Sequence, residues 1–265
     1  MRPAVCLLAT LAFGFRFWAE DSRRHVAPSY SAAGVVNAAS NVVGDLAPNT
    51  FATIYGSDLS FFTRILSSED LRGDRLPTSL GGVTVFIGPI PALMYYVSPK
   101  QINLLIPSIL DPGEYDLRIV REGLAGPAVR IALRDVAPAL FQLDQETAVA
   151  TTADWSLITR ESPAEPGRYV VLWATGLGPT NPDTIYGYVP PAAAWLRRLG
   201  EFQVLLDGVA VESNRVTYAG VAPGWAGLYQ INVKLPEQMN PDPEIQIGLG
   251  GQVSPSGLRL PVRAE

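Results

Sequence analysis

The chain has 265 residues, of which 48% are hydrophobic and 17% charged, so it can bury a substantial core and does not have the composition of a disordered protein. Its formal net charge of −5 argues against a general nucleic-acid binder, because such a protein presents a basic surface to the phosphates. The 24 glycines and 23 prolines favour short strands joined by turns over long helices.

The N-terminal segment is typical of an export signal. Arg2 is followed by an apolar run, residues 4–15, that is too short to span a bilayer, and then by polar residues. We expect a signal peptide over residues 1–19 and a polar tether over residues 20–33; an uncleaved N-terminal anchor is the alternative. The only cysteine, Cys6, lies in the apolar run, so the mature chain would have no disulfide. Once the run is removed, we expect no transmembrane span in the mature chain.

After the tether, short segments with the alternation of half-buried strands are separated by Gly and Pro turns. In the first half we expect strands over residues 34–40, 47–56, 82–88, 91–97, 97–107, 115–121 and 128–136. In the second half we expect strands over residues 165–176, 202–211, 216–219, 227–236, 244–250 and 257–262. A short helix is expected around residues 67–72, inside a long connection. Short strands without a long helical period indicate antiparallel β-sandwiches.

One stretch occurs twice. Residues 97–107 contain Gln-Ile-Asn followed by apolar residues and Pro, and the same pattern returns at residues 227–236. The flanking segments repeat as well, in the same order and at similar distances. The repeat predicts an all-β chain of two tandem antiparallel immunoglobulin-like β-sandwiches, over residues 34–141 and 142–265.

Many ordered motifs resemble those of a known family. They are Val35-Val-Asn-Ala-Ala-Ser40, Ala47-Pro48, Tyr55-Gly56, Leu76-Pro77, Leu80-Gly-Gly-Val83, Tyr96-Val-Ser-Pro99, Gln101-Ile-Asn103, Ala137-Pro138 with Phe141, Ala174-Thr-Gly-Leu-Gly-Pro179, Tyr218-Ala-Gly220 and Gly227-Leu-Tyr-Gln-Ile-Asn-Val233. Over residues 31–262 the chain resembles the Solibacter-type uncharacterised C-terminal domain of acidobacterial secreted proteins. Each unit is also similar, more loosely, to the IPT/TIG immunoglobulin-like domains. The resemblance implies an extracytoplasmic location and an immunoglobulin-like fold, but no activity. Lys100 departs from the family pattern, which has a small residue before Gln-Ile-Asn.

Common catalytic chemistry lacks the residues it needs. The single histidine, His25, lies in the tether, which argues against Ser-His-Asp and Cys-His relays and the usual zinc sites. We predict no catalytic residue, no metal site and no cofactor. Asp111, Glu114 and Asp116 form the densest acidic cluster of the first unit and leave a glycan hydrolase as an alternative, although a solvated turn at Pro-Gly also explains them. Calcium is compatible with such carboxylates but is not predicted, because no regular ligand spacing is present.

The repeated motif also suggests a binding surface. Alternation places Gln101 and Asn103 on one face of their strand, and Gln230 and Asn232 likewise. Such amides either hydrogen-bond a neighbouring loop and hold it on the sheet, or bind sugar hydroxyls. Trp225, in a Pro-Gly-Trp-Ala-Gly loop that could expose the indole, supports the second interpretation, although a tryptophan in a sandwich more often belongs to the core. The candidate ligand-binding residues are Tyr96, Gln101, Asn103, Trp225, Tyr229, Gln230 and Asn232.

These observations lead to one hypothesis with two alternatives. The hypothesis is a non-catalytic binding and adhesion module, secreted or at the cell surface, with an extracellular polysaccharide or a surface protein as partner. The alternatives are a structural spacer or assembly domain of the cell surface, and a carboxylate-dependent extracellular glycan hydrolase. If the motif amides only hold a loop, we expect function in the long connections over residues 60–77 and 181–199.

Overall fold

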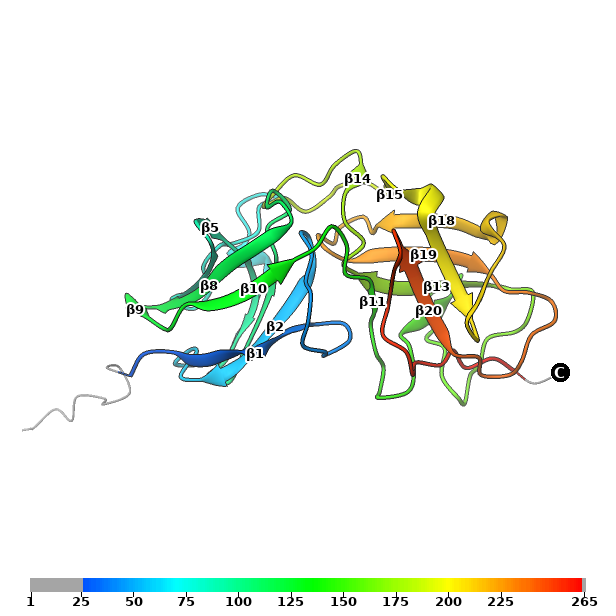
Figure 1. Ribbon diagram of the computed structural model, residues 1–265, viewed down its shortest axis with the longest axis horizontal. Coiled ribbons are helices and arrows are strands. Elements are labelled where there is room, and N and C mark those ends of the chain that lie inside the picture. Colours follow the sequence, from blue (N-terminus) through cyan, green and yellow to red (C-terminus); the bar gives the residue numbers. More distant parts are fainter. Residues whose placement is uncertain (1–25, 264–265) are drawn as a thin grey trace, which may run out of the picture.

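The computed structural model describes residues 26–263 and confirms the all-β fold, with two units lying end to end along the long axis (Figure 1). The predicted signal peptide, residues 1–19, lies outside the described residues, as does the start of the tether. Among the described residues, none of the helices has the length and apolar character needed to cross a membrane.

The first unit consists of two antiparallel sheets. The sheet that contains the first Gln-Ile-Asn strand has the order β1 (Ser29–Asn37), β2 (Phe51–Ser57), β7 (Gln101–Leu105), β6 (Leu93–Val97), β3 (Arg64–Ile65). The facing sheet has the order β10 (Val129–Leu133), β8 (Gly113–Arg121), β4 (Val83–Ile87), β5 (Ile90–Pro91), with β9 (Leu124–Ala125) paired to β8. The helix expected around residues 67–72 is a single 3-10 turn, η2 (Ser68–Asp70).

The second unit repeats this plan. Its sheet with the second Gln-Ile-Asn strand has the order β11 (Ala139–Leu140), β13 (Tyr169–Thr175), β19 (Tyr229–Lys234), β18 (Val216–Val221), β15 (Ala194–Leu196), β14 (Thr180–Asn181), with β12 (Ala150–Thr152) also on β13. The facing sheet has the order β17 (Val209–Ala210), β16 (Phe202–Leu206), β20 (Ile245–Leu249), β21 (Gln252–Val253). Two further 3-10 turns are η3 (Leu199–Glu201) and η4 (Ser213–Arg215). We call the Gln-Ile-Asn sheet of each unit its motif sheet.

Alternation along the motif strands builds both cores. In β7, Ile102 and Leu104 are fully buried in the core of the first unit. In β19, Ile231 and Val233 are buried in the core of the second unit. The amides between these residues therefore point to the outer face of each motif sheet, which is the face turned away from the core.

The repeat seen in the sequence is also present in the structure. The motif strand occupies the same place in both units, with β2 and β6 on either side of β7 and β13 and β18 on either side of β19. In each unit the neighbouring strand has a register shift that sets a tyrosine opposite the motif asparagine: Tyr96 pairs with Asn103, and Tyr218 with Asn232. The two halves thus share their pairing down to a local irregularity.

Strand β1 begins earlier than expected, at Ser29, so the predicted tether over residues 20–33 ends too late. The cause is Tyr30, whose side chain is buried in the first core. Its hydroxyl donates to the Pro127 carbonyl at 2.5 Å and accepts from the Ile119 N–H at 2.7 Å, which fixes this part of the chain on the first unit.

Two other boundaries also differ from the prediction. Strand β11 (Ala139–Leu140) pairs with β13, and Leu140 lies in the second core, so the second unit begins before residue 142. The strand expected over residues 257–262 is not formed. That segment makes isolated bridges only, at Arg259 and Val262, while burying Leu258 and Leu260.

The units meet in a packed junction with its own apolar cluster. Its buried members come from both units and are Leu76, Leu93, Leu105 and Ala226. The two long connections contact each other here: the Leu76 N–H donates to the Gly187 carbonyl at 2.8 Å and the Val189 N–H to that of Asp74 at 2.9 Å. Residues 60–77 and 181–199, where function was expected as an alternative, therefore help to join the units.

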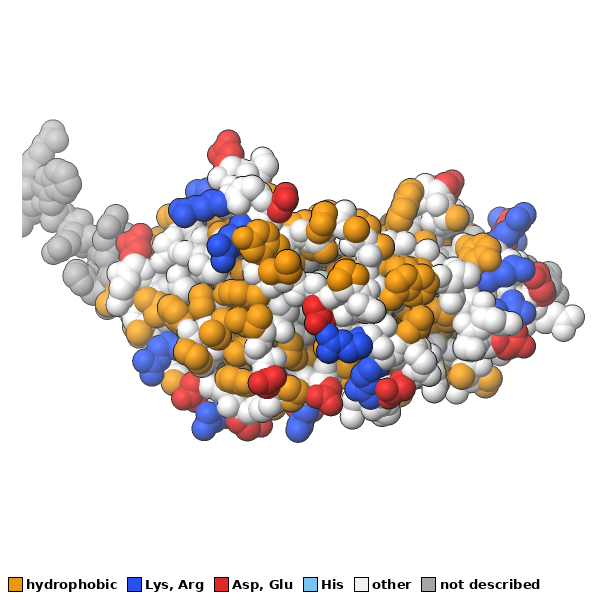
Figure 2. Space-filling view, turned by 90° about the horizontal axis from the view of Figure 1, so that it is seen from above, with side chains coloured by type: hydrophobic (Ala, Val, Ile, Leu, Met, Phe, Trp, Pro, Cys, Tyr) orange, Lys and Arg blue, Asp and Glu red, His pale blue; other side chains and the backbone are white. Residues whose placement is uncertain are grey.

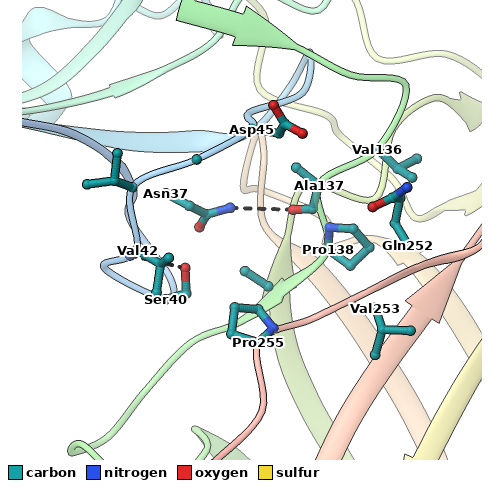
Figure 3. A pocket seen from close by; sticks show the side chains of 13 residues that line it. Asn37, Ser40, Val42, Asp45, Val136, Ala137, Pro138, Gln252, Val253 and Pro255 are labelled. Carbon is teal, nitrogen blue, oxygen red and sulfur yellow. Dashed lines mark hydrogen bonds between the residues drawn. The ribbon is translucent and has the colours of Figure 1, made fainter. Parts of the chain in front are cut away.

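Polar contacts fix the junction as well. The Phe51 N–H donates to Thr175 Oγ1 at 3.0 Å, and Thr175 Oγ1 donates to the Gly227 carbonyl at 2.9 Å. A small pocket of about 230 Å³ lies between the units, where Asn37 Nδ2 donates to the Ala137 carbonyl at 3.4 Å. Figure 3 shows the residues that line this pocket. The two units are thus held in one arrangement.

Candidate functional site

The four motif amides hydrogen-bond within their own strands. Gln101 Nε2 donates to Asn103 Oδ1 at 2.8 Å, and Gln230 Nε2 donates to Asn232 Oδ1 at the same distance. Thr53 adds a 3.1 Å bond to Asn103 Oδ1. Within residues 26–263, no loop is held by these side chains, which are half-buried on the outer faces. The remaining amide donors and acceptors are therefore free to meet a ligand.

A groove of about 510 Å³ runs beside the first motif strand and reaches into the second unit. Gln101 and Asn103 form part of its wall. Its aromatic lining is Phe51, Tyr55, Tyr95, Phe141 and Trp225. The Phe51 ring packs edge-on against Tyr95, with 4.9 Å between ring centroids, so part of this lining is held by its own contacts.

A second hollow, of about 440 Å³, continues the groove over the second unit. The two hollows share Phe141, Trp225 and Leu228, and the second adds Trp173 and Val149. We call the combined feature the junction groove. Trp155 packs against Trp173 at 5.9 Å between centroids and widens the aromatic surface at this end.

The loop that presents Trp225 is held on both sides of the indole. The Gly224 N–H donates to the Pro190 carbonyl at 2.8 Å, and Tyr95 of the first unit donates its hydroxyl to the Ala226 carbonyl at 3.3 Å. Gly227 has φ of 79°, and a Cβ there would lie 2.1 Å from Leu105 Cδ1, so a larger residue would be strained and would displace the Leu105 side chain. Trp225 nevertheless remains 58% exposed. A large apolar side chain is thus fixed in place and left uncovered.

The tryptophans of the described residues are concentrated in the second unit. Every tryptophan of the described residues, Trp155, Trp173, Trp195 and Trp225, belongs to the second unit, and none is buried. Trp173 is opposite Gln230, and Trp195 is opposite Gly220, the other neighbour of Gln230. Sandwich tryptophans often belong to the core, whereas these four lie at least partly on the surface of the second unit.

Two residues predicted for the site lie elsewhere. Tyr229 is fully buried in the second core, where its hydroxyl accepts from Asn49 Nδ2 at 3.0 Å and donates to the Gly178 carbonyl. It joins the units and cannot meet a surface ligand. Tyr96 is half-buried beside Asn103 but does not line the groove, whereas Tyr95 does. The register shift between Met94 and Tyr96 turns both tyrosines away from the core.

No charged side chain is found among the described residues that line the junction groove. Figure 2 shows hydrophobic side chains gathered over both units on the face seen from above, with many of the charged side chains toward the margins of the view. Asp111 and Glu114 are exposed at the start of β8, and Asp116 is exposed in an ion pair with Arg130 at 3.3 Å. Within residues 26–263 there is no group of three or more His, Cys, Asp or Glu side chains that could hold a metal ion.

No family model matches the chain, and no curated protein does. Among solved structures, it is similar to SGBP-B of the Bacteroides ovatus mixed-linkage glucan utilization locus (11% identity, TM-score 0.33, covering 83% of this chain and 43% of that one). It is also similar to SGBP-B of a Bacteroides uniformis xyloglucan utilization locus (10% identity, TM-score 0.27, 89% and 49%) and to the Escherichia coli adhesin FdeC (14% identity, TM-score 0.24, 90% and 66%). The chain spans less than half the length of the two Bacteroides proteins. We therefore infer function from this chain's own side chains.

Proposed function

We propose that this chain is a non-catalytic, extracytoplasmic module that binds polysaccharide in the junction groove. The observation that carries the proposal is Trp225, which is fixed by contacts to both units and is 58% exposed over a groove walled by Gln101 and Asn103. Sugar rings have apolar faces that pack on aromatic rings, and hydroxyls that pair with amides. An apolar groove with a few polar groups suits such a ligand.

Two features support a binding role over hydrolysis. Canonical glycoside hydrolysis uses a pair of carboxylates on either side of the scissile bond. The described lining of the junction groove offers amides and aromatic rings but no carboxylate. The acidic residues Asp111 and Glu114 lie instead on an exposed turn that leads from one sheet to the other, which favours the interpretation of a solvated turn. Asp111 also lines a separate pocket of about 630 Å³, together with Asp135 and Asp183.

The cellular location and the family are part of the same proposal. The apolar run over residues 4–15 supports export, and the ordered motifs over residues 31–262 support membership of the Solibacter-type family. A surface polysaccharide or one from the surroundings would then be the ligand. A surface protein is the other partner that such a module could meet.

Affinity electrophoresis in gels that contain soluble polysaccharides tests the proposal. We expect retardation of the chain in at least one gel, and about 30-fold weaker binding for Trp225→Ala, since an interface tryptophan commonly contributes about 2 kcal/mol. Phe62→Ala is the matched control, because Phe62 is an exposed aromatic residue (49%) that does not line the groove. Thermal unfolding of both variants checks that they are folded.

Two outcomes would overturn the proposal. If no polysaccharide in a broad panel retards the chain, a spacer or assembly role is favoured. If the chain releases reducing sugar from a polysaccharide, and Asp111→Asn or Glu114→Gln abolishes that release, the chain is an enzyme.

A further inference from the structure

The second Gln-Ile-Asn copy does not line the junction groove, although its amides are arranged as in the first copy. We propose that Gln230 and Asn232 belong to a second subsite on the outer face of the second motif sheet, and that the ligand of both subsites is an uncharged polysaccharide. This inference rests on the proposed function, because it extends the same ligand beyond the groove.

The subsite is a cross-strand row. Trp173 on β13 is opposite Gln230 on β19, which is opposite Gly220 on β18, which is opposite Trp195 on β15. Adjacent strands are spaced by about 4.8 Å, so the three steps set the backbone positions of the two tryptophans about 14 Å apart. Two aromatic platforms with an amide between them can hold successive parts of one sugar chain.

Tyr218 fills the space at the middle of the row. Gly220 is buried, and a Cβ at this position would lie 2.1 Å from the Ala194 carbonyl oxygen and 2.7 Å from the Tyr218 hydroxyl. The close approach of the backbones therefore requires glycine here. A ligand that crosses the sheet from one indole to the other would pass over the Tyr218 side chain.

The far platform is held in place before any ligand arrives. Trp195 is 43% exposed, and its indole packs edge-on against Tyr218 at 4.9 Å between centroids. The Tyr218 hydroxyl donates to the Val221 carbonyl at 2.7 Å, which fixes the supporting ring. A rigid aromatic platform loses little side-chain freedom on binding.

The charges around the row favour an uncharged ligand. Lys234, on the same face near one end of β19, is paired with Glu237 at 3.1 Å. Arg197, just past Trp195, is paired with Asp183. Neither cation is left to attract a uronate or a sulfate, and no Lys, Arg, Asp or Glu occupies the four positions of the row.

The row is continuous with the junction groove, because Trp173 lines the groove and also begins the row. A long chain can occupy both subsites at once, whereas a short oligosaccharide fills only one. Linked sites raise the apparent affinity without new contacts, so a polymer should bind more tightly than its oligosaccharides.

The test compares Trp195→Ala, Gln230→Ala and Trp225→Ala by titration calorimetry, using a neutral polysaccharide that retards the wild type and a tetrasaccharide made from it. We expect Trp195→Ala to weaken polymer binding about tenfold or more, as for a tryptophan at an interface. Gln230→Ala should weaken it in the same direction, and it disturbs packing less because Gln230 is half-exposed. Trp225→Ala should weaken both ligands. Tyr169→Ala is the control, since Tyr169 is exposed on β13 but lies outside the row.

The outcomes separate the two proposals. If polymer binding depends on Trp225 but is unchanged in Trp195→Ala and Gln230→Ala, the second subsite is wrong and the junction groove stands. If polygalacturonate binds more tightly than every neutral polymer, the uncharged class is wrong. If no glycan binds at all, both proposals fail together.

Discussion

Gly176 lies where β13 leaves the second unit toward the junction, and replacing it with alanine probes how closely the segments meet. Its φ is 77°, and a Cβ there would lie 2.0 Å from the backbone oxygen of Ala137 and 2.7 Å from its carbonyl carbon. The Ala137 N–H donates to the Gly176 carbonyl at 2.8 Å, so the two backbones are tied together at this point. A side chain cannot be accommodated by a rotamer change, because the obstacle is main chain.

The expected loss in the free energy of unfolding has two parts. A non-glycine residue in the left-handed region costs about 1–2 kcal/mol. Overpacking a tight contact adds about 1–3 kcal/mol. We therefore expect Gly176→Ala to lower the free energy of unfolding by about 2–5 kcal/mol. Gly208 is the matched control, because it has the same φ of 77° but a Cβ added there would meet no atom within 4 Å. Gly208→Ala should lower the free energy of unfolding only by the conformational part, about 1–2 kcal/mol.

Urea denaturation followed by tryptophan fluorescence measures both variants. The tryptophans of the described residues all belong to the second unit, so the signal reports on the unit that contains both glycines. If Gly176→Ala is no more destabilising than Gly208→Ala, the close approach to Ala137 does not constrain the fold, and the reasoning is refuted.

Two further outcomes concern the tyrosines at the junction. Tyr229→Phe removes a buried hydroxyl that hydrogen-bonds to Asn49 and Gly178. Because these groups are left unsatisfied, we expect the free energy of unfolding, measured by urea denaturation, to fall by about 1–3 kcal/mol. An unchanged midpoint would contradict this. Burial raises the pKa of Tyr229 and of Tyr95 above that of the unfolded chain. The contribution of these tyrosines to the free energy of unfolding is therefore fully present below about pH 10, the pKa in the unfolded chain. Above this pH it falls by about 1.4 kcal/mol per pH unit for each tyrosine, because the unfolded chain loses the proton first. Tyr229→Phe should show a shallower alkaline slope than the wild type, and equal slopes would rule out this tyrosine as a source.

Much of the fold follows from alternation along the chain. The alternating apolar residues of the Gln-Ile-Asn segments predict two strands, and both lie at the centre of a sheet. Strands of two or three residues, such as β14 (Thr180–Asn181) and β21 (Gln252–Val253), are too short to show any period. The early start of β1 depends on Tyr30 reaching Pro127 across 97 residues, which no local pattern indicates.

The candidate site is partly within reach of the same reasoning. The Gly-containing loop around Trp225 predicts an exposed indole, and the indole is exposed. The prediction of Tyr229 as a surface residue goes against its own pattern, because Tyr229 alternates in phase with Ile231 and Val233 and therefore faces the core. Trp173 alternates against Leu172 and Ala174, a signal that could have placed it outside.

The remaining part of the site needs the three-dimensional arrangement. Phe141 and Trp225 are 84 residues apart in the sequence, yet they line the same groove. Tyr95, and not the predicted Tyr96, lines the groove because the strand has a register shift there. No residue in the local sequence indicates this shift. These rings meet because the two units pack against each other, and the sequence of one unit alone does not indicate this contact.

The end-to-end arrangement has a mechanical consequence. Strand β1 begins at one end of the long axis and the last described residues lie at the other, so a force pulling on these two segments acts along that axis and loads the junction (Figure 1). Inside each unit, ladders of backbone hydrogen bonds resist the force together, whereas the junction is held by a small apolar cluster and scattered bonds. Tension would therefore part the units first and open the surface between Tyr95 and Trp225 while both sandwiches stay folded.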